Sequence, residues 1–299
     1  MRVVVLEAFN PEEVLSRLPH ALGLHHGWPP CPRCQVATWA GEVVEADAGG
    51  PFALGDRVFG CIAGYKPEVP WGCYADLAVV PAQHLAKIHD GMSYTDAAAL
   101  CLTALTAHQA LAAARLRPGQ RVLAHAAAGG VGSAAVQLAK AQGLEVVATA
   151  SGGNAAVVEE LGADQVIDYK QQRFEQVLRG SPVDAVIDAV GGDYEPRSLS
   201  VLHRSGTFVN LFAQFELWPL LKGKLRGLLR LGPRYATLMV EPSGAGMRAT
   251  AELAAEGKLR PHVAAVMPLE QAGEAHRQVY GGHVRGKVVL QVAAAEHAQ

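Results

Sequence analysis

The sequence predicts an α/β protein built on a doubly wound parallel sheet, accompanied by a small barrel-like β-domain. Residues 121–150 read as an apolar strand, a glycine turn, an amphipathic helix and a second apolar strand. Further strands recur at 165–168, 183–188 and 207–212 with helical segments between them, which is typical of a parallel sheet. Several short strands joined by turns between residues 39 and 88 indicate the β-domain.

The composition is that of an ordinary folded protein. The 299 residues predict two domains, and a content of 50% hydrophobic and 18% charged residues excludes an intrinsically disordered chain. A net charge of −2 gives no general attraction to nucleic acid. We expect no integral membrane segment, because we find no apolar run of about 18 residues. Five scattered cysteines fit reduced thiols in a cytoplasmic protein.

The N-terminal part alternates between clear and unclear patterns. Residues 1–10 predict a first strand, whereas residues 11–38 contain several prolines and clustered histidines without a sustained period. Two strands separated by a glycine-proline turn are expected between residues 39 and 60. Further strands are expected at 74–80 and around 85–88.

Helical character begins at Ser93, where Thr95 and Asp96 form a good start signal, and it continues to Arg115. After the central parallel strands, the pattern predicts in order a helix at 244–258, a strand at 263–266, a helix at 270–279 and a strand at 287–292.

The turn before the central helix has the form of a dinucleotide-binding turn. Glycines let the main chain approach a pyrophosphate, and the helix N-terminus offers unpaired N–H groups to it. In the usual G-x-G-x-x-G spacing, Ala127 replaces the first glycine here. An isolated match would fit a tightly packed turn equally well, but here the flanking strands and the helix are all present. We therefore predict that Gly129, Gly130, Val131 and Gly132 hold a pyrophosphate.

The end of the second strand favours NADPH as the cofactor. NAD sites usually carry an acidic residue there, which binds the ribose 2′-hydroxyl. This chain instead has Ser151, two glycines and Asn154, with no acid until Glu159, so we expect a 2′-phosphate to meet no carboxylate. Tyr169 and the basic residues that follow it are candidates for the phosphate contact, and an aromatic cap on the sheet edge is an equal alternative for Tyr169.

Several short motifs occur in a consistent order between Trp39 and Val292. They are GDRVFG (55–60), WGCYADLAVVPAQHLAKI (71–88), LTALTAHQAL (102–111), AAAGGVGSAAVQLAKAQG (126–143), LGADQVIDY (161–169), VIDAVGG (186–192), EGKLRP (256–261), PLEQAGEAH (268–276) and RGKVVLQV (285–292). Together they resemble the zinc-independent medium-chain dehydrogenases/reductases, in the group of quinone oxidoreductases and enone reductases.

This resemblance implies a Rossmann domain at residues 95–258. It also implies a GroES-like β-barrel domain, incomplete at its N-terminal side, from residues 1–94 and 259–299. The implied activity is NADPH-dependent hydride transfer without zinc, either to a quinone or to the C=C bond of an α,β-unsaturated carbonyl, as in an enoyl reductase domain. We further expect a homodimer.

The resemblance also implies roles for particular residues. Thr106 should face the nicotinamide, and Val190 and Phe212 should line its pocket. Tyr65 and Trp71 lie in a segment expected to flank the substrate, although a role in loop packing is at least as consistent with their sequence context. No catalytic residue is identified.

Residues 11–38 depart from the family pattern. Relatives have an Ala-Gly-Val-Asn-Pro loop here, which usually supplies an Asn and a Tyr near the reacting carbonyl, and only Ala40-Gly41 of the following strand is recognisable. An alternative is therefore a catalytically impaired nucleotide-binding scaffold or regulatory protein of the same fold.

Two other features could bind different partners. Cys31 and Cys34 form one C-x-x-C pair and His25-His26 has no neighbouring Glu, so we expect free thiols and no metal, because a tetrahedral zinc site needs four ligands. A zinc alcohol dehydrogenase is disfavoured for the same reason. The segment 220–231 predicts a basic amphipathic helix, for which packing on the protein or on a partner subunit is favoured over a membrane surface.

Overall fold

The structure of the protein is a computed structural model. This structure describes residues 2–6, 38–62, 73–211, 232–281 and 284–292 of the 299-residue chain. The chain divides into two compact units. The first unit comprises Met1–Leu105 and Glu241–Gln299, and the second comprises Thr106–Val240. The predicted domain boundaries at residues 95 and 258 stay a proposal.

The second unit is built on a six-stranded parallel sheet with the strand order β11-β10-β9-β6-β7-β8. The strands are β6 (Arg121–Ala124), β7 (Glu145–Ala150), β8 (Gln165–Asp168), β9 (Val183–Asp188), β10 (Leu202–Asn210) and β11 (Arg234–Thr237). Counted from β6, this is the 3-2-1-4-5-6 order of a doubly wound sheet. The predicted fold class is confirmed, and the strand order reverses between β6 and β9.

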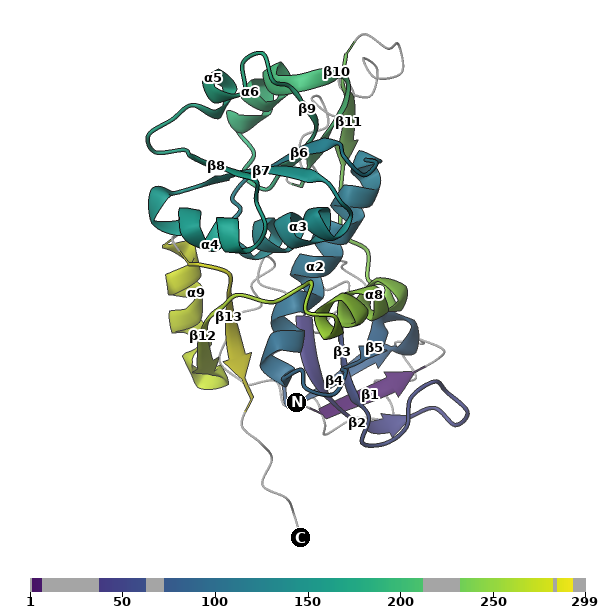
Figure 1. The fold of residues 1–299 in the computed structure, drawn as a ribbon. Coiled ribbons are helices and arrows are strands. Elements are labelled where there is room, and N and C mark those ends of the chain that lie inside the picture. The colour runs from purple at the N-terminus through teal and green to yellow at the C-terminus, as the bar shows by residue number, and fades with distance from the viewer. Residues whose placement is uncertain (1, 7–37, 63–72, 212–231, 282–283, 293–299) are drawn as a thin grey trace. The chain divides into compact units, whose positions relative to one another are not determined.

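Helices cover both faces of this sheet. Figure 1 shows α3 (Gly130–Ala141) and α4 (Ala155–Glu160) on one face, and α5 (Phe174–Val177) and α6 (Tyr194–Val201) on the other. Each helix follows one strand and precedes the next, as right-handed crossovers between parallel strands require. Both faces of the central strands β6, β7 and β9 are therefore covered, which explains their largely apolar sequences.

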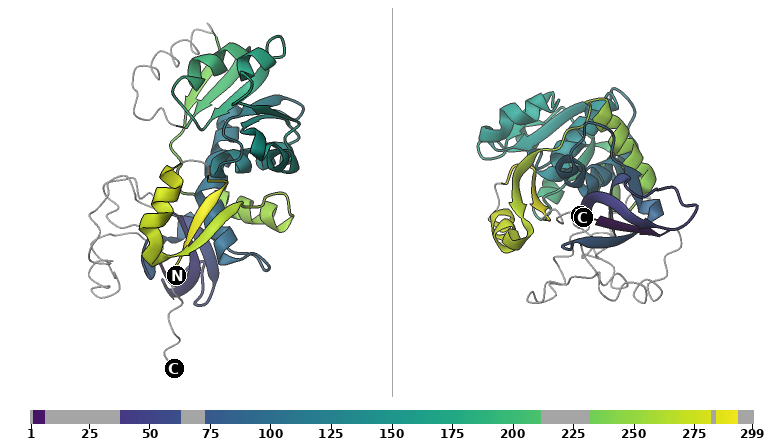
Figure 2. Two further views of the ribbon diagram at one scale, coloured as in Figure 1. Left: turned by 90° about the vertical axis from the view of Figure 1, so that its left-hand side faces the viewer. Right: turned by 90° about the horizontal axis from the view of Figure 1, so that it is seen from below.

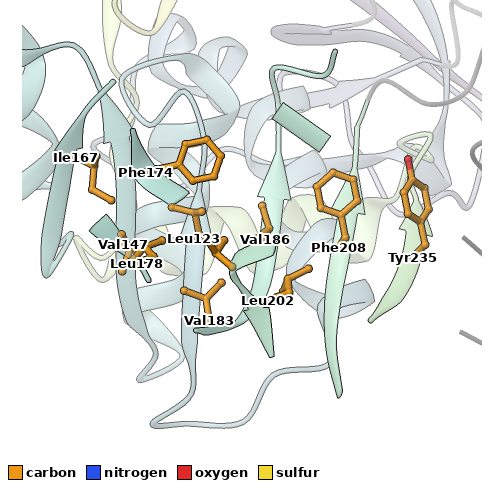
Figure 3. Packing of buried hydrophobic residues seen from close by; sticks show 11 residues of the cluster. Leu123, Val147, Ile167, Phe174, Leu178, Val183, Val186, Leu202, Phe208 and Tyr235 are labelled. Atoms are coloured by element: carbon orange, nitrogen blue, oxygen red, sulfur yellow. The ribbon is translucent and has the colours of Figure 1, made fainter. Parts of the chain in front are cut away.

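The core on one face of the sheet draws on every strand. Its fully buried members include Leu123, Val147, Ile167, Val186 and Phe208, one from each of five strands, and Figure 3 shows them in a row across the sheet. Burial of each such side chain contributes about 1.5–3 kcal/mol to the free energy of unfolding.

The first unit contains a mixed five-stranded sheet with the order β4-β1-β2-β3-β5. Its strands are β1 (Arg2–Leu6), β2 (Thr38–Ala46), β3 (Arg57–Cys61), β4 (Leu77–Pro81) and β5 (Leu85–Lys87). β2 and β5 are antiparallel to β3, whereas β1 is parallel to both β2 and β4. The strands predicted from the sequence therefore belong to one sheet.

The C-terminal part of the first unit adds two helices and a strand pair. Helix α8 (Gly244–Ala255) contacts β5, and a Cβ on Gly244 would lie 2.6 Å from the Leu85 carbonyl oxygen. β12 (Val263–Pro268) and β13 (Lys287–Gln291) form a parallel pair joined through α9 (Ala272–Tyr280), as Figure 2 shows.

Helix α2 (Tyr94–Ala114) has 21 residues, and the sequence boundary between the two units, after Leu105, falls inside it. In the described part of the chain it is the one helix long and apolar enough to cross a membrane, although 61% of its apolar window is buried inside the protein. Core helices of soluble proteins can be equally long and apolar. The many alanines of α2 give it a higher hydropathy than we expected from the sequence. The predicted segment 220–231 lies outside the described residues, as does most of 11–38.

Candidate dinucleotide-binding site

The main chain turns sharply between β6 and α3. Ala126 has a left-handed conformation with φ of 52°. The Gly129 amide donates a hydrogen bond to the Ala126 carbonyl oxygen over 2.9 Å, and the Ala127 amide donates to the Thr149 carbonyl oxygen in β7 over 3.0 Å. These bonds hold the bend at the carboxyl ends of β6 and β7, which is the edge where parallel α/β sheets bind ligands.

The glycines of the bend differ in how strictly they are required. A Cβ on Gly132 would overlap the Ala126 carbonyl oxygen and lie 2.7 Å from the Ala127 Cα, whereas a Cβ on Gly129 would lie 3.2 Å from that oxygen. Gly132 therefore permits the first turn of α3 to pack on the bend. The methyl group of Ala127 is fully buried, which explains why this position accepts alanine.

The N-terminus of α3 has the properties of an anion site. An α-helix leaves the amides of its first turn without intrahelical partners, and here no side chain caps them. No acidic residue stands in the first turn of this 12-residue helix, so its positive dipole end is not neutralised locally. The predicted role of Gly129–Gly132 as a pyrophosphate cradle fits this geometry.

The end of β7 continues into a short 3-10 turn that begins after Ser151. The Asn154 side-chain amide donates a hydrogen bond to the Ser151 hydroxyl over 3.0 Å. The other polar atom of that side chain, Oδ1, is buried and lacks a hydrogen-bond partner among the described residues. An unpaired buried acceptor carries a desolvation cost that a donor group on a ligand would remove.

A carboxylate lies beside this turn, and it comes from the neighbouring strand. A Cβ on Gly152 would lie 2.6 Å from Asp168 Oδ2, while Asp168 Oδ1 accepts a hydrogen bond from the Lys170 amide over 3.0 Å. The parallel register pairs Ala150 with Asp168, so the ends of β7 and β8 are adjacent. The expectation of a carboxylate-free pocket beside Ser151 is therefore wrong, because it considered only the strand that ends there.

Tyr169 extends from the same corner of the sheet. Its amide donates to the Ala150 carbonyl oxygen over 3.2 Å, and its side chain is 45% exposed. An exposed ring one residue beyond β8 is compatible with either a cofactor contact or a sheet-edge cap. Its predicted contact with a 2′-phosphate stays a prediction.

The loop after β9 is shaped by Asp188, which the sequence analysis did not single out. Asp188 Oδ1 accepts hydrogen bonds from the amides of Val190 (2.9 Å) and Gly191 (3.0 Å). The residue is 0% exposed, and burial raises the pKa of its carboxyl above the ordinary value. An Asp at the end of an apolar strand, with a Gly-Gly pair beginning three residues later, is a signal that could have identified this Asx-type turn.

This loop presents Val190, the residue predicted to line the nicotinamide pocket, with 42% of its surface exposed. Asp188 Oδ2 is buried and has no hydrogen-bond partner within the described ranges. The carboxylate thus positions the loop and retains one acceptor at the carboxyl edge of the sheet.

Asn210 ends β10 at the same edge, where a ligand contact or a loop cap is expected. Its Nδ2 donates to the Tyr235 hydroxyl over 3.0 Å, and that hydroxyl donates to Glu195 Oε2 over 2.8 Å. Burial is the largest of the effects that raise the pKa of Tyr235. Asn210 is 4% exposed, and its side chain has a structural role as one member of this chain of hydrogen bonds.

His125 follows β6 directly and immediately precedes the bend. Its Nδ1 lies 3.0 Å from the Thr149 hydroxyl and its Nε2 lies 2.9 Å from the Ser198 hydroxyl. Burial, and then the charge of Arg197, lower the pKa of this imidazole to about 3, so it is neutral near pH 7. It fixes the strand end and is no candidate for acid–base chemistry.

The other predicted contacts divide into two groups. Thr106 is half-buried on α2, and its predicted role at the nicotinamide stays a prediction. Tyr65, Trp71 and Phe212 lie outside the described residues.

No group of three or more His, Cys, Asp or Glu side chains that could hold a metal ion occurs in the described part of the chain. The Cys31–Cys34 pair and His25-His26 lie outside it. Cys61, Cys73 and Cys101 are buried free thiols, and burial raises the pKa of Cys61 to about 12.

Comparison with known proteins points to one group of enzymes. A family model described as zinc-binding dehydrogenase matches residues 161–290. The chain is 33% identical over 265 residues to the mitochondrial NAD(P)H oxidoreductase RTN4IP1 of Bos taurus, with 81% of the chain and 65% of the relative covered. The chain therefore spans about 65% of the length of this relative. RTN4IP1 of Danio rerio is 30% identical over 280 residues, covering 85% of the chain and 70% of the relative.

Solved structures with a related fold agree with this result. The quinone oxidoreductase from Coxiella burnetii superposes with a TM-score of 0.73 at 29% identity, covering 95% of this chain and 87% of that one. The CurK enoyl reductase superposes with a TM-score of 0.74 at 28% identity, covering 86% and 78%.

Proposed function

Because this chain belongs to the medium-chain dehydrogenase/reductase family, in the group of quinone and enone oxidoreductases, we propose that it is an NADPH-dependent reductase. Its substrate is a quinone or the C=C bond of an α,β-unsaturated carbonyl, as the names of its structural neighbours suggest. The single observation that carries the proposal is the bend Ala126–Gly132, in which the uncapped N-terminus of α3 faces the ligand-binding edge of the sheet.

Different residues at this edge of the sheet bind different parts of the cofactor. The first-turn amides of α3 hold the pyrophosphate, and Ser151 with Asn154 faces the adenosine ribose. We propose that Val190, on the loop held by Asp188, contacts the nicotinamide. The bound cofactor supplies the hydride, while the protein orients it and supplies donors to the developing oxyanion.

The cofactor preference depends on a balance of charges. Ser151 at the end of β7 offers no acid to a ribose 2′-hydroxyl, which favours NADPH, and Lys170 follows Tyr169 as a cation for the phosphate. The Asp168 carboxylate beside Gly152 acts in the opposite direction. We propose that NADPH is preferred, and that Asp168 limits the size of this preference.

Fluorescence titration with NADPH and with NADH tests this balance. Asp168→Asn removes one negative charge and should raise the NADPH-to-NADH affinity ratio about 5-fold, as expected for about 1 kcal/mol of partly screened repulsion. Lys170→Met should lower the same ratio. An unchanged ratio in both variants would exclude this corner of the sheet as the 2′-phosphate site.

We also propose chemistry without zinc, as the resemblance to the zinc-independent group of the family implies. NADPH consumption with a small quinone and with an enone, measured with and without a chelator, tests this directly. Turnover that survives the chelator supports the proposal, and turnover that requires added zinc contradicts it.

One alternative has a specific observation in its favour. Residues 11–38 lack the family loop that usually supplies an Asn and a Tyr near the substrate carbonyl, which favours a nucleotide-binding scaffold without turnover. Tight NADPH binding together with no consumption of NADPH by any tested quinone or enone would establish this alternative. A loss of both binding and turnover would reject both functions.

A further inference from the structure

The first unit contains a cavity of about 620 Å³ that the proposed reductase function does not use. Its walls come from β2, the first turns of α2, α9 and the whole of β13, all of which belong to the first unit. A cavity of this size is within the range of small-molecule sites in proteins.

Much of the wall is apolar and incompletely packed. The interior residues of β13, Val288, Val289 and Leu290, all line the cavity and are only half-buried, although a strand with this sequence normally buries at least one face. Val279 of α9 also lines it and is 53% exposed. An apolar occupant would remove this surface from water.

One donor in the wall has no hydrogen-bond acceptor among the described residues. The side chain of Lys287, at the start of β13, is half-buried and makes no hydrogen bond to a described residue, although its ammonium interacts electrostatically with the Cys101 thiol. An ammonium group can only donate hydrogen bonds, so it requires an acceptor.

The charge in the wall is also one-sided. Lys287 is the only Lys, Arg, Asp or Glu among the described residues that line the cavity. The nearby histidine, His276, is bonded through Nε2 to the Tyr74 hydroxyl over 2.9 Å. Burial lowers the pKa of the Lys287 ammonium, as expected for a cation that lacks a counter-charge.

From this combination we propose that the cavity binds a small apolar molecule carrying one carboxylate. The carboxylate accepts hydrogen bonds from the Lys287 ammonium, and the apolar body covers the exposed face of β13. Such a carboxylate supplies both the missing acceptor and the missing charge.

Calorimetric titration of the full chain with octanoate and with octanol tests the proposal. Octanoate should bind with a Kd of about 0.1 mM or lower, which corresponds to about 5.5 kcal/mol for ten heavy atoms. Octanol has the same chain without the charge and should bind at least about tenfold more weakly.

Two variants separate the effect of the Lys287 charge on binding from a general effect on the fold. Lys287→Met keeps the apolar stem and should weaken octanoate binding about tenfold or more while leaving octanol binding unchanged. Lys258→Met, which alters an exposed lysine paired with Glu256 in the same unit, is the matched control and should bind octanoate like the wild type.

Equal affinity of wild type and Lys287→Met for octanoate would overturn the proposal, as would equal affinity of the wild type for octanoate and octanol. NADPH titration of Lys287→Met should match the wild type, so this result does not depend on the proposed reductase function.

Discussion

Replacing Gly132 with alanine tests the geometry on which cofactor binding depends. A Cβ at this position would overlap the carbonyl oxygen of Ala126 and lie 2.7 Å from both the Ala126 carbonyl carbon and the Ala127 Cα. Non-bonded carbon atoms normally approach to about 3.5–4.0 Å, so the bend and the helix must separate by roughly 1 Å. All three obstructing atoms are main chain, so no side-chain rotation can relieve the overlap.

The magnitude follows from two contributions. Overpacking of this kind costs about 1–3 kcal/mol of the free energy of unfolding. The displaced first-turn amides would also lose hydrogen bonds to a charged pyrophosphate, each worth about 1.5–3 kcal/mol. We therefore expect the Kd for NADPH to rise at least about tenfold in Gly132→Ala.

Fluorescence titration with NADPH and urea unfolding measure the two effects separately. Gly129→Ala should be milder, since its Cβ would lie 3.2 Å from one carbonyl oxygen. Gly232→Ala serves as the control, because its Cβ would meet nothing within 4 Å and its φ is not positive. The reasoning is refuted if Gly132→Ala retains wild-type affinity and stability, or if Gly232→Ala impairs binding equally.

Three further predictions concern stability. Since burial lowers the pKa of His125 to about 3, below pH ~6.5 the unfolded chain binds a proton that the native chain does not, and stability falls as pH decreases toward 3. Between pH 7 and pH 5 the wild type should lose about 2 kcal/mol more than His125→Asn in urea unfolding, and equal losses would contradict a buried neutral imidazole. Arg197→Met removes ion pairs and stacking on two aromatic rings, and should cost about 1–2 kcal/mol in the same assay. Gly286→Ala should destabilise the β12–β13 pair by about 2 kcal/mol or more, because its φ is +74° and its Cβ would overlap the His262 carbonyl oxygen. Gly257→Ala, with φ of +70° but its nearest contact at 3.8 Å, should cost only about 1 kcal/mol in thermal unfolding.

The periodicity of the sequence was sufficient for the parallel sheet. Strands β8 and β9 begin and end as predicted, because each has a short apolar centre and follows the regular alternation of strands and helices along the chain. β11 was not predicted, since its four residues, Arg234–Thr237, show neither a regular alternation nor a sustained apolar run, and they pair with β10 in the folded sheet. The bend between β6 and α3 could also be predicted from the sequence, because glycine spacing is a local property of the chain.

The features that require distant residues to meet were decided only by the tertiary structure. Asp168 reaches Gly152 because the register of two parallel strands brings their ends together, and a search along one strand does not find it. Trp39 and Lys287 line one cavity although they come from opposite ends of the chain. Periodicity reports which face of an element is buried, whereas the identity of its neighbours depends on register and topology.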